Sequence, residues 1–174
     1  MRRRMLFLLG GAAGAGLDQI HVRTGVLSYA SPGRVGQPWW VAPQFGAAAV
    51  VLFEAARPFS VQADAPGQVT LASDVAWLVG SYAASGLWRR RPRALAVALY
   101  LSWAARTIAR TDRRSVVTYG ALLALLGCAY EHRLAGTGAF SYFRPDLGNV
   151  PAWLPGLYLH GAPLALDLAR GASA

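Results

Sequence analysis

The sequence has no lysine, a single cysteine and few charged residues of any kind. Only 14% of its 174 residues are charged, against about 25% in ordinary soluble domains. This scarcity excludes a disordered chain and a soluble enzyme with a charged, solvated surface. The lone Cys128 excludes an intrachain disulfide and a multi-cysteine zinc site. Because it lies in the apolar run LLALLGCAY, a packing role is favoured.

Acidic residues are also scarce, and their shortage leaves the chain strongly basic. There are 8 Asp and Glu against 17 basic residues, all of them arginine, which gives a formal net charge of +9. A nucleic-acid-binding protein would interleave such residues along one element. Here the arginines stand in clumps between long apolar runs, as charges do at membrane boundaries. We therefore expect a membrane protein and no nucleic-acid partner.

The apolar runs define the expected helices, because about 20 helical residues cross about 30 Å of hydrocarbon. Short segments with proline, glycine or arginine separate the runs, and tryptophan and tyrosine stand near their ends. The sequence predicts a single all-α domain over residues 1–174, an integral membrane bundle of six transmembrane helices. The approximate spans are 5–22, 36–55, 69–88, 93–110, 115–131 and 150–169.

The third and fourth spans carry charges. The third must tolerate Asp74, and the fourth has only the charge-free run 94–105. That run spans the bilayer only if Arg106, and with it Arg110, extends outward to the headgroups. A re-entrant segment or a buried amphipathic helix are the alternatives for the fourth run.

Orientation rests on competing groups of arginines. The start MRRR favours a cytoplasmic N-terminus, whereas the cluster Arg89–Arg93 favours the opposite orientation. We expect both termini to be cytoplasmic. The first helix is not a cleaved leader, because Asp18, Gln19 and His21 stand where small residues of a cleavage site would be.

Three polar residues are candidates for intramembrane chemistry. Asp18 and His21 are three residues apart and share a helix face, where they could hold a ligand headgroup or relay a proton. Alternatively, the helix has reached the interface there and both side chains meet water. His160 lies inside the sixth apolar run. It is either functional or hydrogen-bonded to a neighbouring helix.

Other polar groups have simpler interpretations. Glu131 follows the fifth run and is expected to be an interfacial charge. The pairs Arg106–Arg110 and Asp167–Arg170 are expected only to fix helix ends. The spacing of Gly10 and Gly14 favours close helix packing, and glycine-rich faces make a homo-oligomer plausible. Motifs for a nucleophile, a metal or a phosphate-binding loop are missing, so we expect no catalytic residue, metal or cofactor, and no enzyme activity.

Several short motifs, in order along the chain, resemble the INSIG (insulin-induced gene) family. They are Leu17–Arg23 with Gln19 and Ile20, Trp39-Trp40-Val41, Val79-Gly80 with Ala84-Ser85, Thr111–Ser115, Pro145-Asp146, and Trp153-Leu154-Pro155 with Gly161. The last match closes on Asp167 and Arg170, with Asp167 where the family has asparagine. The cluster Arg89–Arg93 has no counterpart in the family. The all-arginine, Ala- and Gly-rich composition points to a bacterial relative.

This resemblance implies six transmembrane helices around a lipid-accessible cavity, cytosolic termini and no catalysis. Eukaryotic members reside in the endoplasmic reticulum, bind oxysterols and retain partner membrane proteins. A bacterial relative would lie in the inner (cell) membrane. Asp112 matches the loop aspartate that the family needs for partner binding, so it is the candidate partner-binding residue.

The leading hypothesis is a sensing or regulatory membrane protein that holds a lipid between its helices. A diacylglycerol-like ligand suits a bacterium better than a sterol-like one, and the expected lining is Gln19, Trp77, Tyr82, Trp103 and Tyr119. The alternative is a small transporter or lipid flippase that uses Asp18, His21 or His160 as a polar relay.

Overall fold

The structure, a computed structural model, describes residues 3–60 and 68–172. Within these ranges it contains six helices and two short strands. They are α1 (Arg3–Thr24), β1 (Leu27–Tyr29), α2 (Val41–Ser60), α3 (Gln68–Leu87), α4 (Pro92–Ile108), α5 (Arg113–Gly136), β2 (Phe140–Tyr142) and α6 (Leu154–Gly171). The prediction of six helices is confirmed, whereas the two strands were not expected.

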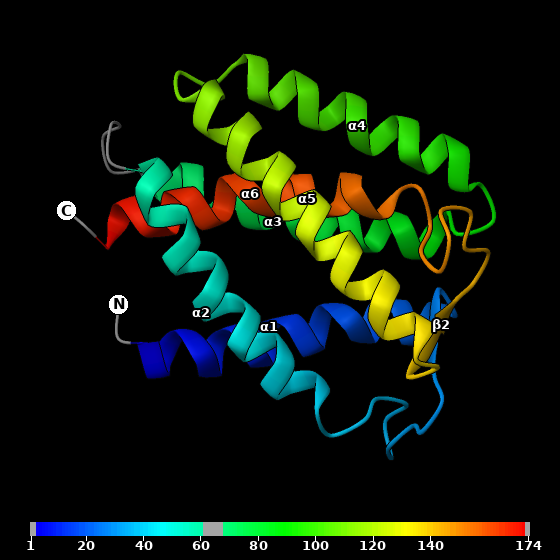
Figure 1. Ribbon diagram of the computed structural model, residues 1–174. Coiled ribbons are helices and arrows are strands. Elements are labelled where there is room, and N and C mark those ends of the chain that lie inside the picture. The colour runs from blue at the N-terminus through cyan, green and yellow to red at the C-terminus, as the bar shows by residue number, and fades with distance from the viewer. Residues whose placement is uncertain (1–2, 61–67, 173–174) are drawn as a thin grey trace.

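The helices form a bundle with two chemically different ends (Figure 1). We call the end where α1 begins, α6 ends and residues 109–112 connect α4 to α5 the terminal end. The opposite end carries β1, β2 and the connection 88–91 between α3 and α4, and we call it the sheet end. The central element is α6, which packs against α2, α3, α4 and α5.

Close packing of α1 on α2 depends on glycine. A Cβ atom at Gly10 would overlap the Cβ of Ala49, and one at Gly14 would overlap the ring of Phe45. Only glycine permits this approach of the two backbones. The predicted role of the Gly10–Gly14 spacing is therefore confirmed, and the helix that occupies this face is α2 of the same chain.

Two apolar clusters fill the bundle, one toward each end, and α6 contributes to both. The cluster at the sheet end includes Leu27, Leu99 and Leu157, and that at the terminal end includes Phe53, Val116 and Leu166. Both clusters contain side chains from at least three helices or strands, so each end of the bundle has a packed core of its own.

The two strands join segments from opposite parts of the chain. They pair antiparallel, with Leu27 opposite Tyr142 and Tyr29 opposite Phe140. The pairing continues beyond the strands, because the amide of Phe143 donates to the carbonyl of Val26 at 2.8 Å. The segment after α1 is thereby fixed to the segment before α6.

Helix boundaries differ from the expected spans where proline and turns intervene. The second helix begins at Val41 rather than near 36, because a turn over residues 33–37 and Pro38 precede it. The last helix begins at Leu154 rather than near 150 and carries a proline in its first turn, where no backbone N–H is needed. The fifth helix continues to Gly136.

Among the described helices, α1 is the one that by length and composition could cross a membrane unaided. It lies near the N-terminus and is mostly unburied. A leader segment or the core helix of a soluble protein can meet the same criterion. Helix α4 has 17 residues and is therefore slightly short for an untilted crossing.

Candidate functional site

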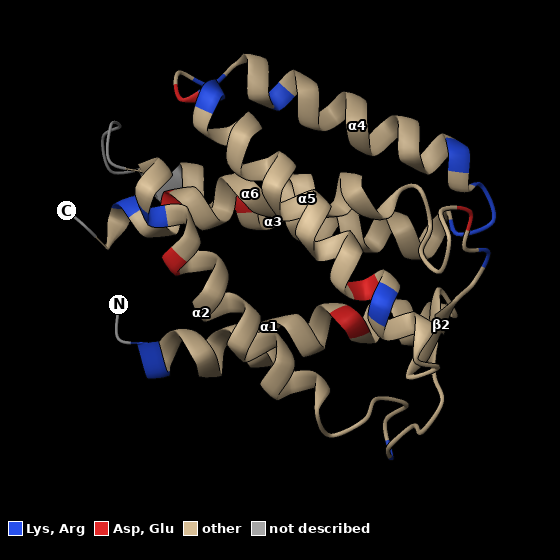
Figure 2. Ribbon diagram, viewed as in Figure 1, with Lys and Arg blue, Asp and Glu red and all other residues tan. Residues whose placement is uncertain are grey.

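A network of six charged residues joins α3, α4 and α6 at the terminal end. We call it the arginine–aspartate network, and its members are Asp74, Arg106, Arg110, Asp112, Asp167 and Arg170. Figure 2 shows where basic and acidic residues lie along the ribbon. All six side chains are largely buried, so their charges are compensated inside the protein and not by water.

The individual pairs are short and cross between helices. Nη2 of Arg106 in α4 lies 2.6 Å from Oδ1 of Asp74 in α3. Both terminal nitrogens of Arg110 donate to the Asp167 carboxylate in α6, at 3.1 and 2.8 Å. The expectation that Arg106 and Arg110 extend outward is wrong, because buried carboxylates attract them inward. The expectation that these pairs only fix helix ends is wrong for the same reason.

Asp112, the candidate partner-binding residue, belongs to this network. It lies between α4 and α5, and its carboxylate accepts hydrogen bonds from Arg110 (2.8 Å from Nε) and from Arg170. Burial of this carboxyl would raise its pKa, but the two arginines outweigh that effect and hold the pKa below its ordinary value of 3.8. The Asp112 side chain is 9% exposed, so its charge is directed at the protein's own arginines.

His160 sits where α3, α4 and α6 meet, and it is fully buried. Its Nδ1 lies 3.0 Å from Nη1 of Arg106, and its Nε2 lies 3.1 Å from both the Leu99 carbonyl and Ser102 Oγ. Since the guanidinium can only donate, Nδ1 is the acceptor and Nε2 carries the proton. The interpretation of His160 as hydrogen-bonded to a neighbouring helix is confirmed.

Trp77 stacks on His160, with ring centroids 5.5 Å apart, and the guanidinium of Arg106 lies 5.0 Å from the indole ring. The residue is 40% exposed. It therefore forms the outer cover of the buried histidine.

Asp18 and His21 are buried near the sheet end, with 4% and 3% of each residue exposed. The Asp18 carboxylate accepts hydrogen bonds from Tyr29 Oη at 2.9 Å and from Gln37 Nε2 at 2.6 Å. The alternative that these two residues meet water at the interface is wrong, because the connection between α1 and α2 folds back over them.

His21 has its own partners in α3. Its Nε2 lies 2.6 Å from Ser85 Oγ, and its ring stacks on Tyr82 with centroids 4.8 Å apart. The Ser85 hydroxyl donates to the Tyr82 carbonyl, so it accepts from the imidazole. Asp18, His21 and His160, the three residues of the transport hypothesis, thus have hydrogen-bond partners within the protein.

Glu131 is a second carboxylate at the sheet end held by neutral donors. The hydroxyls of Tyr142 and Tyr158 both donate to it. The expectation of an interfacial charge is wrong, because β2 and α6 bring these tyrosines over the end of α5. Tyr142 and Tyr158 lie 11 and 27 residues from Glu131 in the sequence, so the sequence alone does not indicate this contact.

The five residues expected to line a lipid cavity lie in different surroundings. Tyr82 and Trp77 stack on the two histidines. Tyr119 is buried in the core of the terminal end and donates to the Leu52 carbonyl at 2.7 Å. Gln19 Nε2 donates to the Val35 carbonyl at 3.1 Å, whereas its Oε1 is buried and has no hydrogen-bond partner among the described residues. As one lining set, the five residues stay a prediction.

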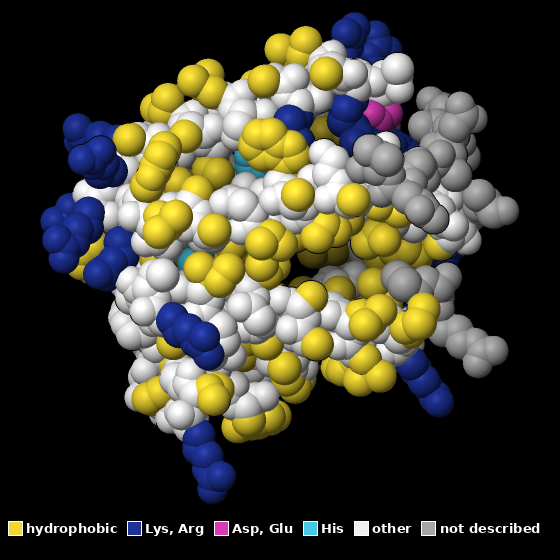
Figure 3. Space-filling view, turned by 180° about the vertical axis from the view of Figure 1, so that it is seen from behind, with side chains coloured by type: hydrophobic (Ala, Val, Ile, Leu, Met, Phe, Trp, Pro, Cys, Tyr) yellow, Lys and Arg dark blue, Asp and Glu magenta, His cyan; other side chains and the backbone are white. Residues whose placement is uncertain are grey.

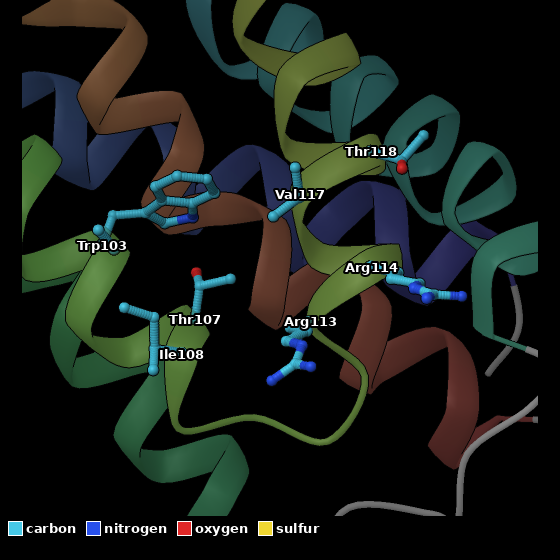
Figure 4. A pocket seen from close by; sticks show the side chains of 8 residues that line it. Trp103, Thr107, Ile108, Arg113, Arg114, Val117 and Thr118 are labelled. Carbon is cyan, nitrogen blue, oxygen red and sulfur yellow. The ribbon is translucent and has the colours of Figure 1, made fainter.

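Trp103 is the one member of that set that lines a pocket between α4 and α5 (Figure 4). The pocket has a volume of about 550 Å³. It is lined by Trp103, Ala104, Thr107, Ile108, Arg113, Arg114, Val117 and Thr118. In the part of the chain that the structure describes, no three His, Cys, Asp or Glu side chains gather as a metal site would require.

These features define the class of protein: a six-helix bundle with charges paired between buried helix faces and with polar networks at both ends. No protein-family model matches the chain. The chain is 30% identical, over 169 residues, to an INSIG protein homolog from Mycolicibacterium vanbaalenii. The alignment covers 93% of this chain and 82% of that protein. The chain therefore belongs to the INSIG family.

Solved structures agree with this assignment. The crystal structure of MvINS, a mycobacterial Insig homolog from Mycobacterium vanbaalenii, matches with a TM-score of 0.81 and 26% identity, covering 98% of this chain and 93% of that chain. A cross-linked trimer of an arginine-to-cysteine variant of MvINS matches with the same values. The family expected from the sequence motifs is thus confirmed, together with the six-helix fold.

Proposed function

We propose that this protein is an integral membrane protein of the bacterial inner membrane, with cytoplasmic termini. In this proposal its six helices span the bilayer, hold a neutral lipid between them and serve a sensing or regulatory role without catalysis. The observation that carries the membrane placement is the exposure of large apolar side chains on the outer faces of the helices.

These apolar side chains lie on at least four helices. Examples are Leu8 and Leu9 in α1, Val75 and Val79 in α3, Val97 and Leu101 in α4, and Leu125 and Leu126 in α5. Figure 3 shows hydrophobic side chains spread over much of the face seen from behind. Soluble monomers rarely expose apolar surface on this scale. In hydrocarbon the same surface is matched by lipid tails, and helices satisfy their own backbone hydrogen bonds there.

The pairing of buried charges also supports placement in a membrane. At the terminal end, the buried Asp74, Arg106 and Asp167 are paired with one another or with Arg110 and Arg170. At the sheet end, the buried Asp18 and Glu131 accept hydrogen bonds from neutral donors. An unpaired charge at that depth would be costly in a bilayer, and pairing is the usual remedy. Helix α4 is short, and the arginines at and just beyond its end can lie within the bilayer because aspartates neutralise them.

The lipid assignment draws on family membership and on one buried acceptor. Figure 3 shows a hollow in the molecule bordered by hydrophobic side chains. Gln19 Oε1 is buried without a partner among the described residues, and a buried acceptor of this kind suits a ligand that donates a hydroxyl. A diacylglycerol-like lipid has one free hydroxyl and an apolar body, and a sterol-like molecule has the same two features. We favour the former in a bacterium.

Self-association and a membrane-protein partner are also part of this proposal. MvINS has been crystallised as a cross-linked trimer, and we infer a homo-oligomer for this chain. The glycine face of α1 is already covered by α2, so the oligomer would use other surfaces. Asp112 would influence a partner through the position of the connection between α4 and α5, since its carboxylate is committed to Arg110 and Arg170.

Native mass spectrometry of the full chain in mild detergent tests the lipid assignment. Added dioleoylglycerol should bind one molecule per protomer. Gln19→Leu should weaken that binding by about tenfold, because the buried acceptor is removed. Gln44→Leu in α2 makes the same chemical change at a side chain that forms no hydrogen bond within the described ranges, and it should retain binding. Failure of both dioleoylglycerol and cholesterol to bind the parent protein would overturn the assignment.

A further inference from the structure

The pocket between α4 and α5 has the size of a ligand site. Its volume of about 550 Å³ lies within the range of roughly 300–1,000 Å³ that is usual for small-molecule sites. Figure 4 shows Trp103, Thr107 and Ile108 projecting from α4 on one side, with Val117 and Arg113 from α5 on the other. It lies at the terminal end of the bundle, whereas Gln19 lies near the sheet end.

Two polar groups in this pocket lack hydrogen-bond partners. Thr107 is 5% exposed, and neither its Oγ1 nor the Nε1 of Trp103 has a partner among the described residues. Elsewhere in the bundle, buried helix hydroxyls bond a carbonyl three or four residues earlier, as Ser85 does at 2.8 Å and Ser81 at 2.7 Å. The Thr107 hydroxyl does not, and Figure 4 shows it directed into the space between the two helices.

The mouth of the pocket is positive. Arg113 and Arg114 form the start of α5, both are exposed, and neither has an ion-pair partner in the described ranges. This contrasts with Arg106, Arg110 and Arg170, which are all paired. In Figure 4 the Arg113 side chain lies below and to the right of Thr107, while Arg114 extends from α5 on the side away from α4. The first turn of a long helix adds further attraction for an anion.

Apart from Thr118, the rest of the pocket wall is apolar, and part of it lies on the surface of the protein. Ile108 is 73% exposed and Val117 is 45% exposed, so an apolar ligand could extend from the pocket along the outer face of α4 and α5. A free inorganic anion would meet the arginines but would gain nothing from these walls. The two arginines lie in the first turn of α5, Thr107 lies in the last turn of α4, and Trp103 lies one helix turn before Thr107.

We propose that this pocket binds a glycerophospholipid with an anionic headgroup. The phosphate would accept hydrogen bonds from Arg113 and Arg114 at the mouth. The ester carbonyls would accept from the Thr107 hydroxyl and the Trp103 indole N–H, and the acyl chains would lie against Ile108 and Val117. Trp103, which the sequence places in the lining of the neutral-lipid cavity, is here assigned to a second pocket. Apart from that residue, the two proposed sites share only the membrane placement.

Lipid titrations of the full chain, followed by native mass spectrometry, test this proposal. Phosphatidylglycerol should bind at least about tenfold more tightly than phosphatidylcholine with the same acyl chains, because only its net headgroup charge complements the mouth. Arg113→Gln combined with Arg114→Gln should remove most of this preference. Arg23→Gln combined with Arg34→Gln changes the net charge equally at exposed arginines of the sheet end and should leave it intact.

Thr107→Val provides a second test that does not alter charge. It should weaken phosphatidylglycerol binding severalfold without lowering the thermal stability of the lipid-free protein, because the hydroxyl has no hydrogen-bond partner among the described residues. If the substitution destabilises the lipid-free protein and leaves lipid affinity unchanged, the hydroxyl serves the fold and the proposal fails.

Three further results would overturn the proposal. They are equal binding of the two phospholipids, equal losses in the two double-arginine variants, and full competition by millimolar inorganic phosphate, which would indicate a free-anion site. None of these three results depends on dioleoylglycerol binding or on the Gln19→Leu variant. Failure of the phospholipid proposal is therefore distinguishable from failure of the neutral-lipid assignment. If the Arg113–Arg114 variant does not fold, Thr107→Val and the comparison of phospholipids still decide the matter.

Discussion

The two ends of the bundle neutralise buried carboxylates in opposite ways. At the terminal end, the buried Asp74, Asp112 and Asp167 each face arginine. At the sheet end, Asp18 and Glu131 face tyrosine and glutamine instead. That end does have arginines, at 89–91 and 93, but they lie toward its surface and form no ion pair within the described residues.

This difference determines how strongly the stability of each end depends on a single side chain. In the arginine–aspartate network each charge is buried together with its counter-charge, and removal of one partner leaves the other uncompensated. At the sheet end the donors are neutral, so the loss of one hydroxyl removes a hydrogen bond and leaves no buried cation behind. The terminal end should therefore respond to charge substitutions more severely than the sheet end.

The largest effect is expected at Asp167, which accepts hydrogen bonds from Arg110 and Arg170. Asp167→Asn should lower the free energy of unfolding by about 3–5 kcal/mol, because two buried guanidinium groups lose their shared anion. Unfolding in mixed micelles, followed by circular dichroism, measures the change. Glu54→Gln, at an exposed pair with Arg3 and Arg57, is the matched control and should change little. If both substitutions lowered the free energy of unfolding equally, burial of the ion pairs would not be the reason for the large effect at Asp167.

An intermediate effect is expected for Tyr142→Phe at the sheet end. The substitution removes one of two hydroxyl donors to Glu131 and should cost about 1–3 kcal/mol of unfolding free energy. Adding Glu131→Gln should restore part of the loss, because an amide needs less compensation than a carboxylate. Tyr130→Phe, at a residue that is half exposed, is the control. A double variant less stable than Tyr142→Phe alone would contradict this account.

A smaller effect is expected on the pH dependence of stability, through Asp112. Since the pKa of Asp112 is lower in the folded protein than the ordinary 3.8, its ionisation stabilises the fold above that pH, and the stabilisation is lost as the pH falls toward the folded pKa. Asp112→Asn should therefore lower the melting temperature at pH 6 and narrow its difference from the parent below pH 4. Thermal unfolding from pH 3 to 6 measures this. A constant difference across that range would show that the charge of Asp112 is not the cause.

The smallest effect is expected for the exposed arginines of the sheet end. Arg90→Gln combined with Arg91→Gln should change the unfolding free energy by about 0.5 kcal/mol or less, because neither side chain has an ion-pair partner in the described part of the chain. Chemical unfolding at low and high salt measures this. If the unfolding free energy fell as much as in Asp167→Asn, the two ends would not differ in their dependence on arginine.

Much of the fold could be predicted from the sequence, because apolar runs bounded by arginine, proline and glycine are a local signal. The spacing of Gly10 and Gly14 also indicated close packing correctly. The strands were missed because they have three residues each, although the alternation in Leu27-Ser28-Tyr29 and in Phe140-Ser141-Tyr142 after Gly25 and Gly138 is a weak strand pattern.

The site was less predictable, because its contacts cross between helices. Asp167 and Arg170 were found as a pair since they are three residues apart, whereas Asp74 and Arg106 meet only through the packing of α3 beside α4. Reasoning from apolar runs also places charges in water by default, so it put Glu131 at the interface and gave the interface as one of two alternatives for Asp18. Their tyrosine partners Tyr29 and Tyr142 come from the two strands that the sequence pattern did not reveal.

The small sheet has a consequence for how the chain is assembled. A two-stranded sheet is barely stable by itself, and β1 and β2 come from the first and last connections of the bundle. During synthesis β1 must wait, unpaired, until four further helices have been made and β2 has emerged. Closure of this end is therefore a late step of biogenesis, and a ribosome stalled before residue 140 would carry a chain in which α1 can pack on α2 while β1 still lacks its partner strand.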